Sequence, residues 1–492
     1  MTGITDQPYA GLLDVPRGAD GRAGVVTEDA NYGRADGDVA MTAPHLMVVG
    51  KTGSGKSRTV LAPNAARWGP RALVVMSSKG DLSELTIRRR AQYGAQYVMD
   101  LSGEIRGGQI EGVDLTPVRI DPCAWIETDD EAMEMASLLM QIGDVGAGGD
   151  GQGSGDAAFW KSLARRRLAC LLRAGGFYRD PDTGEEMWGG GIVWALEAAD
   201  NVGPSAADGG GRGLTQEGLD DIGDETSADD EDEPLDMSTP HWGAAYLRAL
   251  SVGSRHAESL KTARTMDERQ RDSIGINCQV ALGAWAMDST ASPDAKVFSP
   301  AMLATGATLH IVAGMDGAAP TVVSTLLIEI VKYWRKRVGT LAPVMFVLDE
   351  FVNGAQVPAR YLNRWISEGR GLGIRLVLGL QSTKQLTRLW GAPAADELRA
   401  IMPAALILPG AGETEMLKSA AESTPPEERV VTTLDAGGKA SQSRQMVQPT
   451  MGELLPPPRS RTDPRISYGR LLLGGQAGVR VRLLDISGTD LA

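Results

Sequence analysis

The residues of this sequence best suited to chemistry lie in a glycine-rich stretch, Gly50 to Ser57, with the pattern G-x-x-x-x-G-K-S. Glycines allow backbone N–H groups to turn onto phosphate oxygens, and the N-terminus of a following helix adds partial positive charge. In this pattern Lys56 reaches the β- and γ-phosphates, and the hydroxyl of Ser57 ligates Mg²⁺. We therefore expect ATP and Mg²⁺ as cofactors. The residues expected to hold the nucleotide are Gly50, Thr52, Gly53, Ser54, Gly55, Lys56 and Ser57.

Two acidic residues follow an apolar run much farther along the chain. The run from Val344 to Leu348 ends in Asp349 and Glu350. We expect Asp349 to hold Mg²⁺ together with Ser57, and Glu350 to orient and deprotonate the attacking water. Four apolar residues before two acids are common by chance, and an acid here can also cap a helix. The combination with the glycine-rich loop makes the pattern specific.

Two more polar residues are candidates for catalysis. Gln381 ends the next predicted strand, 32 residues after Asp349, where an amide can sense the γ-phosphate. Arg370 lies in a glycine-flanked turn and suits an arginine finger that acts on a neighbouring subunit. The structural alternatives are a strand-end hydrogen-bonding residue and a solvated loop arginine. Arg375 is a weaker candidate for the finger because it lies within a predicted strand.

A sheet of parallel strands would bring these residues together. Apolar runs alternate with helical stretches, which favours an α/β fold. Ligands of such sheets bind at the carboxyl ends of the strands, where Lys56 and Lys79 would lie. The expected strands are 45–49, 71–76, 95–100, 308–313, 343–348 and 374–381, with later candidates at 404–408 and 469–473.

The stretch between the two chemical centres is too long for a compact ATPase core, since 293 residues separate Lys56 from Asp349. Helical periodicity dominates 125–290, so we expect an inserted all-α domain there. The expected helices are 131–142, 156–175, 191–199, 239–250 and 267–287. The expected organisation is a lead-in (1–43), the first part of the nucleotide-binding domain (44–124), the insertion (125–290) with a disordered acidic loop (201–237), the second part (291–484) and a tail (485–492).

Net charge is −14, and residues 217–236 carry eleven acidic and no basic side chains. Without those eleven charges the chain is at −3, so a local basic channel for nucleic acid remains compatible with the composition. The arginine-rich clusters at 88–90, 165–167 and 335–337 can bind phosphates or can be solvated helix faces.

The cysteines and the N-terminal sequence indicate the cellular compartment of the protein. Three separated cysteines, Cys123, Cys170 and Cys278, indicate no disulfide framework and no metal site. The N-terminus has no signal-peptide pattern, and no apolar run approaches the roughly 18 residues of a membrane span. We expect a cytoplasmic protein.

With both centres placed, the sequence resembles the type IV coupling proteins, the TraG/TraD conjugation ATPases. The matching stretches are Val48 to Ser57, Ala62 to Asn64, Ser78 to Leu82, Phe159-Trp160, Leu348 to Phe351, Gly369 to Ile374 and Leu380 to Ser382. The resemblance implies a RecA-like P-loop domain in a homo-hexamer. It also implies a translocase that delivers single-stranded, relaxase-bound DNA to a type IV secretion channel. Relaxosome proteins and channel components would be its partners.

The sequence departs from the family pattern in two places. The usual N-terminal membrane anchor is missing, so recruitment to the inner face of the membrane would need a partner. Ser77 stands where the motif before Lys79 usually has an acid, which argues against a metal or DNA role for that loop. Two alternative functions are a double-stranded DNA pump of the FtsK/HerA kind and a nucleotide-stabilised receptor for protein cargo.

Overall fold

The computed structural model describes residues 6–13, 40, 43–105, 112–146, 155–181, 183–203, 237–292, 294–314, 317–434, 440–458, 465–474 and 478–488. The chain divides into two compact units. The first consists of residues 1–117, 300–315 and 327–492, and the second of 118–299 and 316–326.

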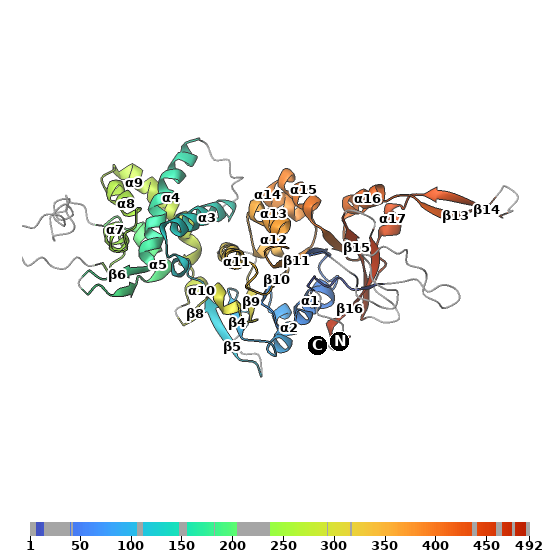
Figure 1. The fold of residues 1–492 in the computed structure, drawn as a ribbon. Helices are drawn as coiled ribbons and strands as arrows, with labels where there is room; N and C mark the ends of the chain where they lie inside the picture. The colour runs from blue at the N-terminus through green and yellow to red at the C-terminus, as the bar shows by residue number, and fades with distance from the viewer. Residues whose placement is uncertain are drawn as a thin grey trace, which may run out of the picture. The chain divides into compact units, whose positions relative to one another are not determined.

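A mainly parallel sheet organises the first unit (Figure 1). Its order is β1-β16-β15-β12-β2-β11-β10-β3-β9-β4-β5, and pairing is parallel from β12 to β5. The α/β fold predicted from the sequence is confirmed. The strands are β1 (Leu12–Leu13), β2 (His45–Val49), β3 (Leu73–Ser77), β4 (Gln96–Asp100), β5 (Leu115–Arg119), β9 (Thr308–Val312), β10 (Val344–Leu348), β11 (Ile374–Leu380), β12 (Ala404–Ile407), β15 (Ile466–Leu473) and β16 (Val479–Leu484).

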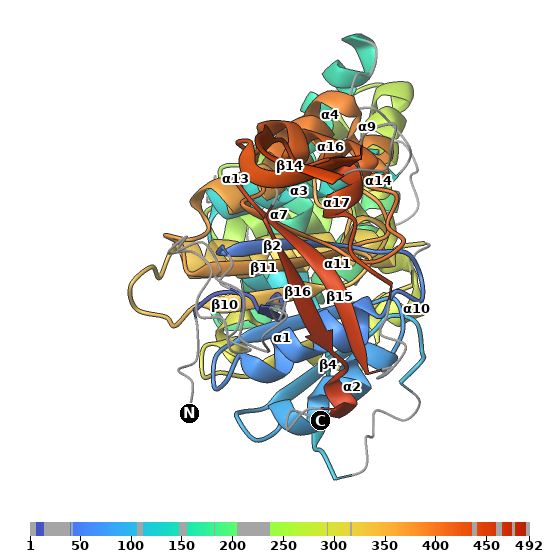
Figure 2. The ribbon, with the colours of Figure 1, turned by 90° about the vertical axis from the view of Figure 1, so that its right-hand side faces the viewer.

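Every residue of β2, β10 and β11 is buried. Strands covered on both faces are almost continuously apolar, with His45 and Arg375 as exceptions near the amino ends of β2 and β11, and these apolar runs marked them in the sequence. The antiparallel pair β15–β16 closes one side of this sheet and stands in front in Figure 2. The helices of the unit are α1 (Ala62–Arg67), α2 (Asp81–Arg90), α12 (Phe351–Gly354), α13 (Ala359–Glu368), α14 (Lys384–Trp390), α15 (Ala392–Ile401), α16 (Thr414–Ser423) and α17 (Met451–Leu454), with α11 (Ala319–Arg335) divided between the units.

The second unit is mostly helical. Its helices are α3 (Asp129–Gly146), α4 (Gly155–Gly175), α5 (Gly191–Asp200), α7 (Trp242–Ser251), α8 (Ala257–Arg264), α9 (Glu268–Leu282) and α10 (Asp288–Ala291). It also contains a small hairpin of β6 (Phe177–Arg179) and β7 (Glu186–Trp188), and the short strand β8 (Lys296–Val297) pairs with the end of β5. The unit is therefore not purely α-helical, because short strands interrupt the helical pattern.

The helix after the glycine-rich loop differs from expectation. The sequence predicts that Pro63 ends or bends its first turn. Instead, residues Ser57–Leu61 form a π-helical turn that continues directly into α1, with Ala62 N–H donating to the carbonyl of Ser57. A proline cannot donate a backbone hydrogen bond, and the wider turn before it lets the helix continue.

Two polar regions contain strands that the sequence analysis did not assign. Residues 6–13 of the lead-in lie against the sheet: Tyr9 and Ala10 are buried, and β1 pairs with β16. The polar tail after residue 410 contains the long hairpin of β13 (Glu427–Leu434) and β14 (Ala440–Val447), which extends away from α16 and α17 in Figure 1. Both features depend on pairing between strands, which a polar sequence does not predict.

Other sequence predictions lie outside the described residues. The sequence predicts a short strand at 23–27 and a flexible glycine-rich loop at 143–155. The strand, most of that loop and nearly all of the acidic tract at 201–237 lie outside the described part of the chain. Among the helices that are described, none has both the length and the apolar composition needed to cross a membrane.

Candidate nucleotide-binding site

The glycine-rich loop follows the carboxyl end of β2. Gly53 and Gly55 have φ of +78° and +89°, values that favour glycine. A Cβ at Gly50 would lie 2.5 Å from Ser54 Oγ and 2.9 Å from Leu408 Cδ1. The loop is therefore tightly wound at its start, while a Cβ at Gly53 would meet nothing within 4 Å. Its backbone can turn N–H groups toward an anion.

Lys56 is almost fully buried, with 6% of its surface exposed. Its Nζ donates to the carbonyl oxygen of Gly50 at 2.7 Å, so the ammonium lies within the loop. Burial lowers the pKa of this lysine, while the nearby carboxylates of Asp349 and Glu350 act in the opposite direction. A buried cation partnered by one neutral carbonyl fits a site for an anionic ligand.

Ser57 and Asp349 meet although 292 residues separate them. The Ser57 hydroxyl donates to Asp349 Oδ2 at 2.8 Å. Burial raises the pKa of Asp349, and the hydrogen bond from Ser57 and the charge of Lys56 oppose that rise. These two oxygen groups, beside a glycine-rich loop, are the donor set that suits Mg²⁺ bound with nucleotide phosphates. The residues present therefore fit a magnesium nucleotide.

Glu350 has an unusual backbone. Among the described residues it is the one non-glycine with positive φ, at φ 47° and ψ 39°. Its Oε1 accepts a hydrogen bond from Gln381 Nε2 at 2.8 Å, and its buried Oε2 has no hydrogen-bond partner. Left-handed backbone in a non-glycine residue costs about 1 kcal/mol and concentrates at functional sites. The strand ends of β10 and β11 thus aim a carboxylate oxygen at the site.

Arg370 lies at the other edge of the sheet. It is exposed, in the turn before β11, whereas Gln381 follows the far end of that strand. A Cβ at neighbouring Gly369 would lie 2.9 Å from His45 Cε1, at the start of β2. Seven strand residues span about 23 Å. Arg370 therefore cannot reach the nucleotide site of its own chain.

Arg375, the alternative candidate for the arginine finger, already binds other residues of its own chain. It is 5% exposed, and its guanidinium binds Asp6 and backbone carbonyls. Lys79 has an exposed side chain in the loop after β3, and Ser77 accepts from its backbone N–H through Oγ at 3.3 Å.

The basic clusters are only partly solvent-facing. Arg90 is fully buried and binds Thr308 Oγ1 together with the carbonyls of Gly69 and Arg71. Arg167 is 7% exposed and donates to backbone carbonyls within the helical unit. These two arginines hold neighbouring segments together and are not available to phosphates.

Sequence reasoning missed a third strand-end acid, Glu413. It is buried, and it accepts hydrogen bonds from Thr383 N at 2.8 Å and Thr383 Oγ1 at 2.6 Å. Gln385 Oε1 accepts from Gln381 N at 3.1 Å in the same loop. The signal was an acid soon after the strand at 404–408, but only the folded chain shows which loop it fixes.

Fold and site together define a P-loop α/β protein of the nucleotide-binding class. Two family models match the chain: "Type IV secretory system Conjugative DNA transfer" over residues 11–187, and "TraM recognition site of TraD and TraG" over residues 343–464. The chain belongs to the type IV coupling protein family, as its sequence motifs predicted.

Solved structures of a coupling protein share the fold. "Plasmid coupling protein TrwB in complex with the non-hydrolysable GTP analogue GDPNP" matches with a TM-score of 0.52 and 16% identity, over 89% of this chain and 85% of that one. TrwB with the ATP analogue ADPNP matches with a TM-score of 0.51 and 15% identity, over 98% and 95%. A search among curated proteins found no match.

Proposed function

We propose that this chain is an ATP-hydrolysing DNA translocase that delivers single-stranded, relaxase-bound DNA to a type IV secretion channel. The observation that carries the proposal is the meeting of Ser57 with Asp349, beside the pair of Glu350 and Gln381. This arrangement unites a phosphate-binding loop, a magnesium-binding pair and a base with one free oxygen.

In the proposed reaction Lys56 would bind the terminal phosphates, and Ser57 and Asp349 would hold Mg²⁺. The metal would supply positive charge against the phosphate oxygens. Glu350 accepts the proton of the attacking water at Oε2, while the hydrogen bond from Gln381 fixes Oε1 and so the orientation of the carboxylate. Arg370 of a neighbouring copy stabilises charge on the transferring phosphoryl group, a contribution of about 10³–10⁵ in rate.

The partners follow from the family and from this geometry. Arg370 lies too far from its own nucleotide site, which supports assembly into a homo-hexameric ring. One matched family description names a TraM recognition site over 343–464, which supports a relaxosome protein as partner of that region. We place the assembly at the inner face of the membrane, where channel components would recruit it.

The test is the steady-state rate of ATP hydrolysis without DNA, with single-stranded DNA and with duplex DNA, against Lys56→Ala as the blank. Stimulation by single strands is the expected result. Stimulation by duplex alone would favour the duplex pump. A rate equal to the blank under all three conditions would contradict the motor and favour the receptor for protein cargo.

A further inference from the structure

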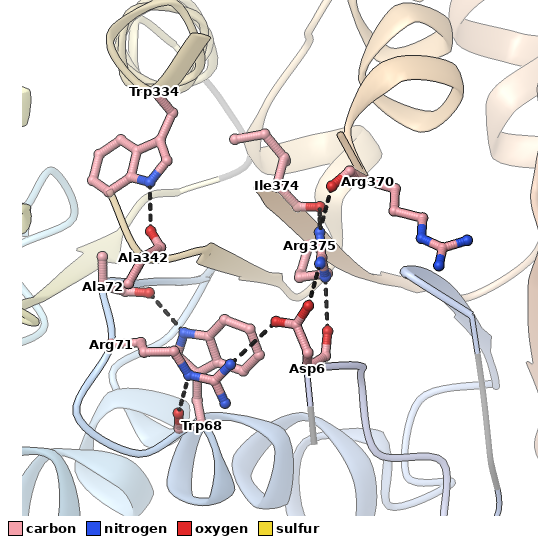
Figure 3. Close-up of polar contacts among 9 residues, drawn as sticks. All are labelled: Asp6, Trp68, Arg71, Ala72, Trp334, Ala342, Arg370, Ile374 and Arg375. Carbon is pink, nitrogen blue, oxygen red and sulfur yellow. Dashed lines mark hydrogen bonds and ion pairs between the residues drawn. The ribbon is translucent and has the colours of Figure 1, made fainter. Parts of the chain in front are cut away.

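Asp6, at the beginning of the described chain, lies between two arginines from distant segments (Figure 3). Its Oδ2 accepts from Arg375 Nη2 at 2.5 Å, and its backbone oxygen accepts from Arg375 Nε at 2.7 Å. Its Oδ1 accepts from Arg71 Nη1 at 3.2 Å. One residue of the N-terminal segment therefore binds two segments of the nucleotide-binding unit that lie far apart in the sequence.

Arg375 also binds the backbone of the turn that carries Arg370. Its Nη1 donates to the backbone oxygen of Arg370 at 3.3 Å and to that of Ile374 at 2.9 Å. The Arg375 side chain is 6% exposed, whereas that of Asp6 is 55% exposed. The backbone of Arg370 is thus tied to Asp6 through a single buried guanidinium.

Arg71 ties the same acid to the helix of the glycine-rich loop. Its guanidinium stacks over the ring of Trp68 at 3.7 Å, and its Nε donates to the Trp68 carbonyl at 3.1 Å. Trp68 is buried directly after α1, and its Nε1 donates to the Ala72 carbonyl at 2.8 Å. Asp6 therefore lies between the end of α1 and the Arg370 turn.

The side chain of Arg370 takes no part in this cluster. It extends away from Arg375 in Figure 3, it is exposed, and it makes no hydrogen bond or ion pair with any residue that the structure describes. The cluster holds the backbone from which this side chain projects and leaves the guanidinium free. A misplacement of about 1 Å can cost about 10²-fold in rate.

We propose that Asp6 and Arg375 are positioning residues that fix the Arg370 turn for its action on a neighbouring chain. This inference rests on the proposed function, in which Arg370 acts in trans. It assigns the N-terminal segment a role at the subunit interface, because Asp6 binds the arginine that holds the Arg370 turn.

Mixed assemblies test the inference. Chains with Lys56→Ala keep Arg370 and donate it, while chains with Arg370→Ala keep an intact nucleotide site and receive it. Neither hydrolyses ATP alone, and their mixture regains activity at interfaces that join the two. Asp6→Asn is then placed on the donating chain in one mixture and on the receiving chain in another. Asp396→Asn, which removes a carboxylate of another exposed ion pair, with Arg399, is the matched control on the donating chain.

Asp6→Asn on the donating chain should lower the regained rate at saturating ATP by tenfold or more, with KM for ATP within about twofold. On the receiving chain, and for the Asp396 control, the rate should stay within about twofold. Equal losses in both placements would show a general effect on folding and overturn the inference, as would an unchanged rate on the donating chain. If the mixture of Lys56→Ala and Arg370→Ala chains, both with Asp6 intact, regained no activity, the trans role of Arg370 would be overturned, and this inference with it.

Discussion

At the scale of single residues, the two carboxylate oxygens of Glu350 lie in different environments. Glu350 Oε1 accepts from Gln381, and Oε2 is buried without a partner. A buried acceptor left without a hydrogen bond costs about 1–3 kcal/mol. Glu350 thus combines an unpartnered buried oxygen with a left-handed backbone, which fits a base that receives its partner only with substrate.

Replacing the base should separate chemistry from binding. In Glu350→Gln the amide oxygen can still accept from Gln381, but the side chain cannot take a proton from water. We expect ATP hydrolysis to fall by about 10²–10⁴, with nucleotide affinity within about threefold. Turnover and equilibrium binding of a fluorescent nucleotide measure the two. Glu397→Gln, an exposed acid on α15, is the control. Hydrolysis that survives in Glu350→Gln would contradict the assignment.

His45, at the start of β2, makes stability depend on pH. Burial, with the nearby charge of Arg375, lowers its pKa to about 4. Its contribution to stability is complete above the ordinary pKa of 6.5 and is lost as the pH falls toward 4, because only the unfolded chain then takes up the proton. His45→Gln should flatten the fall in unfolding free energy between pH 6 and 4.5 by up to about 1.4 kcal/mol per pH unit. Urea unfolding at several pH values measures this, and identical slopes would refute it.

At the scale of elements, the N-terminal segment belongs to the nucleotide-binding unit. Asn64 of α1 accepts from Tyr9 N at 2.6 Å and donates to Tyr9 O at 2.8 Å. It also donates to Val60 O at 2.8 Å. One amide therefore satisfies both backbone groups of a buried residue of the segment and ties the segment to the π-helical turn.

Removing that amide should release the segment. Asn64→Ala leaves the N–H and C=O of buried Tyr9 without these partners, so we expect a loss of about 2–4 kcal/mol in unfolding free energy. Urea unfolding measures it. Asn363→Ala on α13, whose Oδ1 has no hydrogen-bond partner, should change stability by less than about 0.5 kcal/mol. Similar values for the two variants would mean that the Tyr9 contacts contribute little.

At the scale of the whole molecule, the proposed function requires a second chain to complete the nucleotide site. The glycine-rich loop and both acids follow carboxyl ends of β2 and β10, while Arg370 precedes the amino end of β11. Parallel strands place these residues at opposite edges of one sheet. In a ring, the strand ends that carry Arg370 in one chain would face the strand ends that carry the nucleotide site in the next chain. Such a ring would complete every site.

Activity should accordingly depend on assembly. The rate of ATP hydrolysis per chain is expected to rise with protein concentration and to reach a plateau when the chains are assembled, because mass action governs how many Arg370 side chains have a neighbour. Parallel sedimentation velocity and rate measurements over the same dilution series check this. A constant rate per chain in samples that sediment as monomers would contradict it.

The sequence by itself determined the fold class and which residues are candidates for nucleotide chemistry. The glycine spacing of the loop, the acids after an apolar run and the buried parallel strands are all set by neighbours in the chain, and the structure places them as the patterns indicated. Turn geometry and the apolar composition of covered strands depend on residues a few positions apart, which is why they can be read without coordinates.

Only the tertiary structure decided which distant residues meet. The order β2-β11-β10-β3 brings Asp349 to Ser57 across 292 residues and directs Gln381 onto Glu350. It also showed that Arg375 binds Asp6 and that Arg90 is buried. The physical reason is that strand order, register and the burial of a long charged side chain follow from packing over the whole unit, and residues adjacent in sequence do not encode them.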